Sequence, residues 1–568
     1  MLKKKPTVSK KRLLSKSEYL IEYLSASWHP YALIILLGVL VFGRTILFNY
    51  TYFDDDLIIL KKIDSLSNLS TIFQSFKTLY FSAYYRPFIT ISLIIDAQIS
   101  NISPWMYHVS NLVYHLIAGC LTYYLLLKLN SSRLIALIAG IVFILHPLAT
   151  QAVAWILGRN DSLVAIFILI SFIFLINSVS YGKIYYYLLH LLFFFFALLT
   201  KETAAVFPVI ALVYLTLIAR YALFSMKTIR YFFGWAFVII VWLLLRSAAL
   251  SGIKLNEGIF SYHGIISNFP ALIELLGKLV LPVRLSVYPT INSISVILGT
   301  LTISALMISL FLWKKNINRL VVFSIIWIVL FNLPGMVVTI ADNLNRFSYL
   351  ESRAYISIIG FVILLAGMEK WITALSPQRL ISIIISVAVI YSIIIFKYSS
   401  YYQTPLNHWN KAVEMSPGAA DAWFNLALVS ADIYNNIDMA EVNLKKAIAL
   451  NYDNPSYHNW LGTIYGQKNL PSQAEYEFNI SLKLDPADPN TYFNLGYLNY
   501  LNKQFPAAEK YYMMSVKVDS SYFASYYQLI TLYIQQLKYD DALKYAGILK
   551  AKGFNLDPAL LEQIHSRR

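Results

Sequence analysis

The chain has 568 residues, of which 58% are apolar and only 13% are charged, with a formal net charge of +16. A soluble globular protein carries about 25% charged and 45–50% apolar residues, so this composition excludes an ordinary soluble enzyme. The same figures exclude a disordered chain, and the single cysteine, Cys120, excludes an intramolecular disulfide and a thiolate metal cluster. The composition indicates a membrane protein.

Apolar blocks follow one another from about residue 28 to residue 400. Most of them approach the roughly 20 residues that an α-helix needs to cross a bilayer. A shorter apolar block, 87–99, contains Asp96 and is interpreted as interfacial or re-entrant. The sequence therefore predicts an all-α, polytopic membrane domain with about eleven spans, at 29–49, 106–128, 133–154, 161–179, 184–200, 203–220, 229–247, 292–313, 320–340, 354–372 and 380–397.

Lysines and arginines gather in the N-terminal segment 1–27 and in the short loops that would share its side of the membrane. Cytoplasmic loops carry such an excess, so we predict a cytoplasmic N-terminus. An odd number of spans then places the long loops 50–105 and 248–291, together with the C-terminal region, on the periplasmic, extracellular or lumenal side. The basic excess is thereby assigned to the cytoplasmic membrane face, where it meets anionic lipid, and no nucleic-acid partner is expected.

Three adjacent acids, Asp54, Asp55 and Asp56, follow the first predicted span. The simplest interpretation is a solvated loop or the N-cap of a helix. The alternative is a general base that takes a proton from an acceptor hydroxyl. A carboxylate that lies beside other carboxylates, near a low-dielectric boundary, has the raised proton affinity that this task requires.

Further polar residues fall at the predicted outer ends of the spans. Each could be only a paired or snorkelling interface charge. Together they mix basic with acidic groups, which suits an anionic phosphate and acid–base chemistry. A divalent ion at Asp54, His108 and His115 is possible but not favoured, because the spacing is weak evidence. No metal ligand is assigned. The candidates are Arg86, His108, Asn111, His115, His146, Arg159, Asp161, Lys201, Glu202, Glu351 and Arg353.

The C-terminal part of the chain repeats with a period of 34 residues. A small residue at this period, where two helices touch, is typical of tetratricopeptide repeats. We expect a connecting helix in 401–420, four repeats forming an α-solenoid in 421–556, and a tail at 557–568. The residues that keep the period are Ala440, Ala474, Ala508, Ala542, Gly462 and Gly496.

The order of the motifs resembles that of the transmembrane and tetratricopeptide-repeat (TMTC-type) O-mannosyltransferase family and its bacterial relatives. Two positions depart from the family pattern: Gln151 replaces an acid, and the segment after Glu351 lacks the usual Tyr-Leu-Pro-Ser. The matching pieces are Phe53-Asp54-Asp55, Tyr85-Arg86-Pro87-Phe88, His108-x-x-Asn111-x-x-x-His115, His146-Pro147, Gly158-Arg159-x-Asp161, Lys201-Glu202, and Glu351 with Tyr355.

The resemblance implies a C-type (GT-C-like) glycosyltransferase fold over about 28–400. It implies transfer of a sugar from a polyprenyl-phosphate carrier to an acceptor hydroxyl, as in O-mannosylation of protein Ser or Thr, on the non-cytoplasmic face. Asp54 would be the base or its partner, with Asp55 beside it. The repeats would offer a concave face to a protein or peptide partner. The candidates for the lipid phosphate are Arg86, Arg159, Lys201 and Arg353.

Two other classes of function remain as alternatives. A degenerate membrane domain could anchor the repeats as a non-catalytic scaffold for an envelope or secretion complex. A transporter is less favoured, because transporters place ionisable or broken segments near the bilayer midplane. Here the polar residues gather towards one predicted face.

Overall fold

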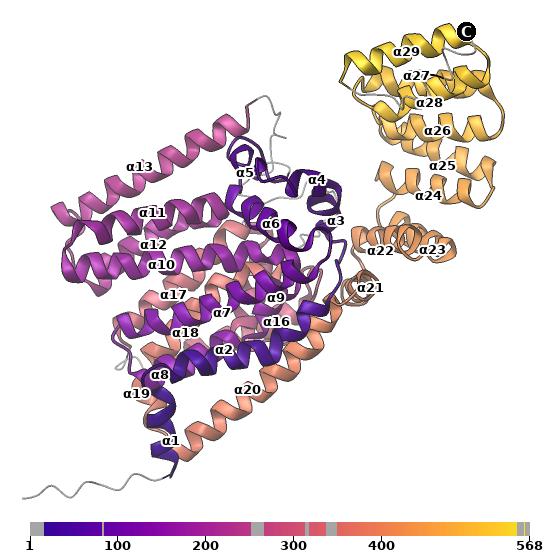
Figure 1. Cartoon of the computed structure of the whole chain (residues 1–568). Helices are drawn as coiled ribbons and strands as arrows, with labels where there is room; N and C mark the ends of the chain where they lie inside the picture. The colour runs from indigo at the N-terminus through magenta and orange to yellow at the C-terminus, as the bar shows by residue number, and fades with distance from the viewer. Residues whose placement is uncertain are drawn as a thin grey trace, which may run out of the picture. The chain divides into compact units, whose positions relative to one another are not determined.

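The computed structural model describes residues 16–81, 84–251, 266–312, 317–336, 349–553 and 562 (Figure 1). The chain divides into two compact units, Met1–Met415 and Ser416–Arg568. Within the described residues the regular secondary structure is helical, apart from an isolated bridge between Phe81 and Tyr84. The predicted all-α class is confirmed.

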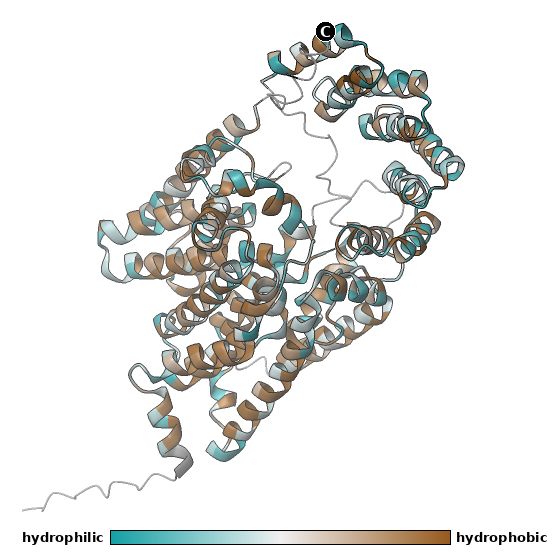
Figure 2. Ribbon diagram, turned by 45° about the vertical axis from the view of Figure 1, so that its right-hand side comes forward, coloured by the Kyte–Doolittle hydropathy of each residue, from teal (hydrophilic) through white to brown (hydrophobic). Residues whose placement is uncertain are grey.

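The first unit holds the apolar helices, which are mostly brown in Figure 2. In chain order its main helices are α1 (Lys16–Ser25), α2 (His29–Phe42), α3 (Asp55–Ile58), α4 (Ile63–Leu66), α5 (Thr71–Gln74), α6 (Pro87–Ser100), α7 (Trp105–Lys128), α8 (Arg133–Ile144), α9 (Thr150–Ala154), α10 (Arg159–Tyr181), α11 (Ile184–Thr200), α12 (Phe207–Val213), α13 (Met226–Ala249), α15 (Phe269–Val280), α16 (Ser293–Leu312), α17 (Arg319–Asn332), α18 (Tyr355–Gly367), α19 (Glu369–Ile372), α20 (Pro377–Ser399) and α21 (Pro405–Met415).

Among the residues of this unit that the structure describes, seven helical segments are long and apolar enough to cross a membrane. An eighth candidate is a bent pair, 133–144 and 147–154, whose halves meet at 47°. The bend falls at His146-Pro147, because proline disfavours the helical conformation of the residue before it. The protein is therefore an integral membrane protein. The seven segments are His29–Leu47, Trp105–Lys128, Ile156–Tyr181, Met226–Ala249, Ser293–Leu312, Arg319–Met336 and Pro377–Tyr402.

The predicted count of eleven spans is not confirmed. The 17 residues of α11 rise about 26 Å, which is less than the roughly 30 Å of a hydrocarbon core. The segment Glu202–Ile218 is likewise a shorter apolar helix, and α18 has only 13 residues. The predicted end of the span 320–340 lies outside the described residues.

The two long loops also contain helices. The predicted loop 50–105 includes α3 to α6, and α6 is itself a short apolar helix. The predicted loop 248–291 includes α15, while residues 252–265 lie outside the described part. At the crossing of α15 and α16 a Cβ added to Gly277 would come within 2.3 Å of the Gly299 Cα, so two glycines allow these backbones to touch.

The described part of the second unit consists of four helix pairs, which follow the four predicted repeats, although α22 begins one residue before the predicted start at 421. The alanines that keep the 34-residue period, Ala440, Ala474, Ala508 and Ala542, are all fully buried. The tetratricopeptide fold predicted from the period is confirmed. The helices are α22 (Ala420–Asp432), α23 (Ile437–Leu450), α24 (Pro455–Gln467), α25 (Pro471–Leu484), α26 (Pro489–Leu501), α27 (Phe505–Val518), α28 (Phe523–Gln535) and α29 (Tyr539–Ala551).

The segment 401–420, where a connecting helix is expected, contains α21, and α21 belongs to the first unit. Its side chains His408 and Trp409 are fully buried there. The segment before α1 and most of the predicted tail 557–568 lie outside the described residues.

Candidate active site

The three acids lie in a turn between the end of the first apolar segment and α3. The buried carboxylate of Asp55 accepts hydrogen bonds from the Thr51 amide (2.8 Å) and the Thr51 hydroxyl (2.6 Å). Asp54 stands at the N-cap position of α3, but its side chain makes no capping hydrogen bond. The N-cap interpretation therefore does not account for Asp54, and its carboxylate remains available for other chemistry.

The environment changes the acidity of both carboxyl groups. Burial, followed by repulsion from Asp56, raises the pKa of Asp54 to about 6. Burial raises the pKa of Asp55 to about 7, although the hydrogen bonds from Thr51 oppose the rise. Carboxyl groups that titrate near neutral pH are suited to proton transfer.

The backbone of this turn is strained. Tyr52 (φ 57°) and Asp54 (φ 64°) both have left-handed conformations. A residue other than glycine in this region costs about 1–3 kcal/mol and persists only where the surroundings hold it. Here Trp155 holds the turn, since its indole Nε1 donates to the Phe53 carbonyl (3.1 Å) and its ring stacks on Phe53 with centroids 5.0 Å apart.

Three of the predicted phosphate ligands come together as a basic cluster, which we define as Arg86, Lys201 and Arg353. Arg86 pairs with Glu202 (2.8 Å) and Lys201 pairs with Asp161. Burial lowers the pKa of Lys201, Asp161 opposes this, and repulsion from Arg86 and Arg353 adds to the lowering. Burial also lowers the pKa of Arg353, and Arg86 contributes to that shift. The three cations therefore lie within electrostatic reach of one another.

Tyr80 lies within electrostatic reach of both the acidic turn and the basic cluster, although nothing in the sequence distinguishes it. Its buried hydroxyl interacts electrostatically with Arg86 and with both Asp54 and Asp55. The hydroxyl has no hydrogen-bond partner among the described residues. A buried, unpartnered hydroxyl within reach of both groups is the signal of a site, but one tyrosine among 43 carries no such signal in the sequence.

Arg159, the fourth predicted phosphate ligand, lies within the protein core. It is fully buried and pairs with Asp96 (2.5 Å). Its remaining donors bond to Asn111 Oδ1 (3.0 Å), to the Tyr107 carbonyl (2.7 Å) and to other buried acceptors. Because its guanidinium is occupied, this geometry favours a structural role.

Several of the supporting polar residues also bond to the scaffold. The amide of Asn111 donates to the Trp155 carbonyl (2.8 Å), His115 Nδ1 pairs with the Tyr355 hydroxyl (2.7 Å), and His146 Nε2 lies 3.0 Å from the Leu279 carbonyl. His108 is buried beside the Phe48 ring. Asn111, His115 and His146 therefore bond to other segments of the first unit.

Glu351 is buried in a separate ion network. It accepts from Lys278 Nζ (2.8 Å), from the Ser286 amide (3.1 Å) and from the Tyr398 hydroxyl (3.1 Å). Gln151, which departs from the family pattern, accepts from the Ser352 amide (2.9 Å). This neutral bond holds the segment 351–354, which carries Arg353, against the segment 150–154. Among the described residues no group of three or more His, Cys, Asp or Glu could hold a metal ion.

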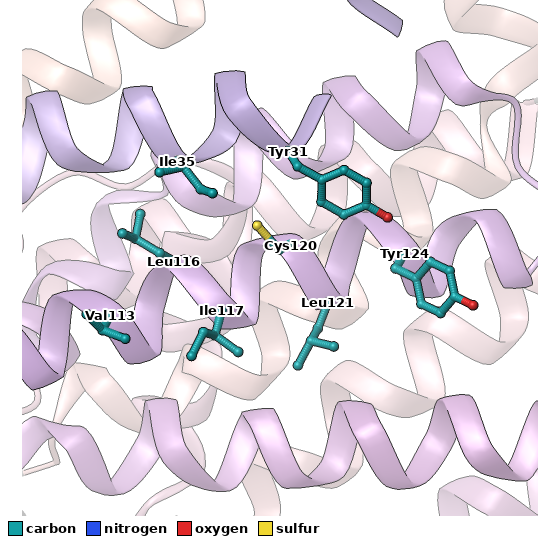
Figure 3. Close-up of a pocket in the computed structure, with 8 residues that line it drawn as sticks. All are labelled: Tyr31, Ile35, Val113, Leu116, Ile117, Cys120, Leu121 and Tyr124. Carbon is teal, nitrogen blue, oxygen red and sulfur yellow. The ribbon is translucent and has the colours of Figure 1, made fainter. Parts of the chain in front are cut away.

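An apolar groove of about 340 Å³ lies between α2 and α7. Figure 3 shows Tyr31 and Tyr124 towards one end of it and Val113 towards the other. The remaining lining residues are Ile35, Leu116, Ile117, Cys120 and Leu121. Such a lining matches hydrocarbon and offers nothing to a charged group.

Comparison with curated proteins identifies relatives over a limited part of the chain. It is 35% identical over 88 residues to human Protein O-mannosyl-transferase TMTC2, which is 15% of this chain and 10% of that protein. It is 29% identical over 89 residues to human TMTC3 (16% and 10%) and 25% identical over 141 residues to human TMTC1 (23% and 16%). The chain thus spans about a tenth of the length of the first of these relatives. No family model matches it.

Comparison with solved structures finds proteins similar to 29% of the chain. Pseudomonas aeruginosa pilF has a TM-score of 0.26 and 20% identity over 72% of its chain. YrrB, a tetratricopeptide-repeat protein with an unusual peptide-binding site, has a TM-score of 0.24 and 18% identity over 81% of its chain. TM-scores this low support no inference about function. The matches to curated proteins, together with the apolar helices and the repeats, confirm the resemblance predicted from the motifs: over the matched stretches the chain is similar to the TMTC-type protein O-mannosyltransferases.

Proposed function

We propose that this protein is a membrane glycosyltransferase. It transfers a sugar from a polyprenyl-phosphate carrier to an acceptor hydroxyl, which in this proposal belongs to a protein Ser or Thr. The observation that carries the proposal is a strained acidic turn, with carboxyl pKa values of about 6 and 7, near a basic cluster: Tyr80 lies within electrostatic reach of both acids and of Arg86. The names of the relatives, which are O-mannosyl-transferases, support the same class of reaction.

In the proposed reaction Asp54 accepts the proton of the acceptor hydroxyl. The hydroxyl oxygen then forms a bond to the anomeric carbon of the sugar, and the bond from that carbon to the phosphate oxygen breaks. The leaving group is the polyprenyl phosphate, which carries away the bonding electron pair. Arg86, Lys201 and Arg353 stabilise its developing negative charge. Asp55, held by Thr51, orients the turn.

The basic cluster suits this role for an electrostatic reason. Arg86 and Lys201 of this cluster pair with Glu202 and Asp161, and repulsion among the three cations contributes to the lowered pKa values of Lys201 and Arg353. An anionic phosphate would relieve that repulsion. The groove between α2 and α7 suits a hydrocarbon chain, and the repeats would bind the protein acceptor through their concave face.

The reaction is proposed for the non-cytoplasmic face, with a cytoplasmic N-terminus. The support is the excess of lysine and arginine in the N-terminal segment and the short loops. A reporter active only in the cytoplasm, fused after Arg568, should be silent. Strong activity of that reporter would overturn the orientation.

The decisive experiment is transfer by the purified, bilayer-reconstituted protein from radiolabelled polyprenyl-phosphate sugars, mannose first, to acceptor peptides. Asp54→Asn should lower the rate by about 10²–10⁴-fold, the usual loss when a proton-transfer group is removed. The matched control is Asp64→Asn, the same change at an exposed position of the same loop, which should leave the rate unchanged. Full activity of Asp54→Asn would refute the proposed base. Inactivity of the unmodified protein with every donor would favour the scaffold.

A further inference from the structure

A contact between distant parts of the sequence holds the acidic turn. Trp409, in α21, is fully buried, and its indole Nε1 donates to the Thr51 carbonyl (3.1 Å). The ring of Trp409 packs edge-on against Phe53 with centroids 5.5 Å apart, and His408 lies on the same ring at 5.6 Å. Close by, the Asn49 amide donates to the Gln403 carbonyl (3.0 Å). The segment after the last apolar span therefore covers the turn that carries Asp54.

Two indole N–H groups donate hydrogen bonds to alternate backbone carbonyls of this turn. Trp409 holds the carbonyl of Thr51, and Trp155 holds that of Phe53. The two strained residues, Tyr52 and Asp54, each follow one of these held carbonyls. A left-handed residue relaxes when its surroundings release it. The two indole hydrogen bonds therefore explain why the strained conformation persists.

We propose that Trp409 is a positioning residue for the acid pair, and that α21 is a working part of the catalytic unit rather than a connection to the repeats. The path is short: Trp409 fixes Thr51, and the amide and hydroxyl of Thr51 fix the carboxylate of Asp55 beside Asp54. That Trp409 positions catalytic groups rests on the proposed function. That Trp409 fixes the conformation of the turn follows from the structure alone.

The role belongs to the indole N–H more than to the bulk of the ring. A phenylalanine at position 409 keeps an aromatic ring against Phe53 but cannot donate to the Thr51 carbonyl. The chain offers a matched control in Trp423 of α22, whose Nε1 likewise donates to a backbone carbonyl, that of Pro417 (2.9 Å), within the repeat unit. Trp409→Phe and Trp423→Phe thus remove the same kind of hydrogen bond at two sites.

The test combines two measurements on the full-length protein. Backbone hydrogen exchange of the segment 49–59 should accelerate in Trp409→Phe and stay unchanged in Trp423→Phe. In the transfer assay Trp409→Phe should lower kcat by about ten- to a hundredfold, the cost of a small misplacement of a catalytic group. The KM for the lipid donor should change little, because the basic cluster keeps its contacts. Trp423→Phe should leave kcat unchanged.

Two results would overturn the inference: unchanged exchange in the turn, or faster exchange with normal kcat. If Trp409→Phe merely unfolds the protein, exchange will rise throughout the first unit. Replacement of Trp409 by its isostere β-(3-benzothienyl)alanine, which keeps the two-ring shape but has sulfur in place of the N–H donor, then decides by the same two criteria. An unmodified protein that is inactive with every donor refutes the proposed function. The exchange result would still decide whether Trp409 holds the turn.

Discussion

Asp54 and Asp55 combine two properties that conflict in most carboxyl groups: they are shielded from water, yet one of them must ionise to act as a base. Their raised pKa values follow from burial and, for Asp54, from repulsion by Asp56. Since a base acts only when ionised, transfer should increase with pH, with an acidic limb near pH 6–7 in kcat/KM. Neighbouring carboxyl groups titrate as a pair, so the limb belongs to both.

Asp56→Asn tests this explanation. Removing the Asp56 charge should shift the acidic limb to lower pH, because the repulsion that raises the pKa of Asp54 is lost. Asp64→Asn, in the same loop but exposed, should leave the limb in place. The assignment of the limb to Asp54 and Asp55 would be contradicted by an acidic limb below pH 5 in the unmodified protein. It would also be contradicted if Asp56→Asn left the limb at the same pH.

The raised pKa values also have a consequence for stability. A carboxyl group whose pKa is higher in the folded than in the unfolded protein stabilises the fold fully below its unfolded value, near pH 4. That stabilisation is lost as the pH rises through 6–7. Asp54→Asn should therefore raise the thermal unfolding midpoint at pH 8 and leave it nearly unchanged at pH 4. Lower stability of this variant at pH 8 would mean that Asp54 is structural.

Arg353 is the member of the basic cluster whose described hydrogen bond is to a backbone carbonyl, that of Gly335 (2.9 Å). A glutamine at this position keeps a donor but loses the charge. Arg353→Gln should raise the KM for the lipid donor about ten- to a hundredfold, as expected for the loss of a charge-assisted bond of roughly 1.5–3 kcal/mol. Arg379→Gln, at an exposed position at the start of α20, is the control and should have no effect. An unchanged donor KM in Arg353→Gln would remove Arg353 from the phosphate site.

Within a single helix, α24, substitutions of two glycines distinguish the effect of packing on stability from the effect of helix propensity. A Cβ on Gly462 would meet the Phe478 ring at 2.7 Å, whereas one on Gly466, a turn later, would meet nothing within 4 Å. Gly462→Ala should therefore destabilise the repeat unit by about 1–3 kcal/mol through overpacking. Gly466→Ala should be neutral or stabilise it by up to about 1 kcal/mol, because alanine favours the helix. Urea denaturation of the two variants decides, and equal stabilities would contradict the packing argument.

At the scale of the whole molecule, the boundary between the units determines which part can be removed. The first unit extends to Met415 and includes α21. A chain ending at Met415 should keep transfer to a small acceptor and lose transfer to a protein acceptor. A chain that ends at Tyr402 lacks Trp409 and should lose both activities. Both chains need to insert equally well, judged by membrane extraction and monodispersity. Equal activity of the two with a small acceptor would show that α21 does not contribute to the site.

The sequence determined the features that depend on local pattern. Apolar blocks near 20 residues predicted the membrane helices, because crossing a bilayer requires that length and composition. The 34-residue period predicted the repeats, since each buried alanine marks a contact between helices that are neighbours along the chain. The adjacent acids and the basic residues at span ends predicted a candidate site in which Arg86, Lys201 and Arg353 do come together.

Only the tertiary structure decided which polar residues are free to act. Arg86 and Arg159 look alike in the sequence, and both lie within electrostatic reach of Tyr80. Arg159, however, is fully buried and pairs with Asp96, whereas Arg86 pairs with Glu202. Trp409 and Trp423 likewise lie 14 residues apart in similar helices. Trp423 bonds to Pro417 within the second unit, whereas Trp409 bonds to Thr51, 358 residues earlier in the chain. Sequence patterns reflect contacts between residues that are close in the sequence. The strain and the proton affinity of the acidic turn instead arise from residues that are far apart in the sequence and meet only in the folded protein.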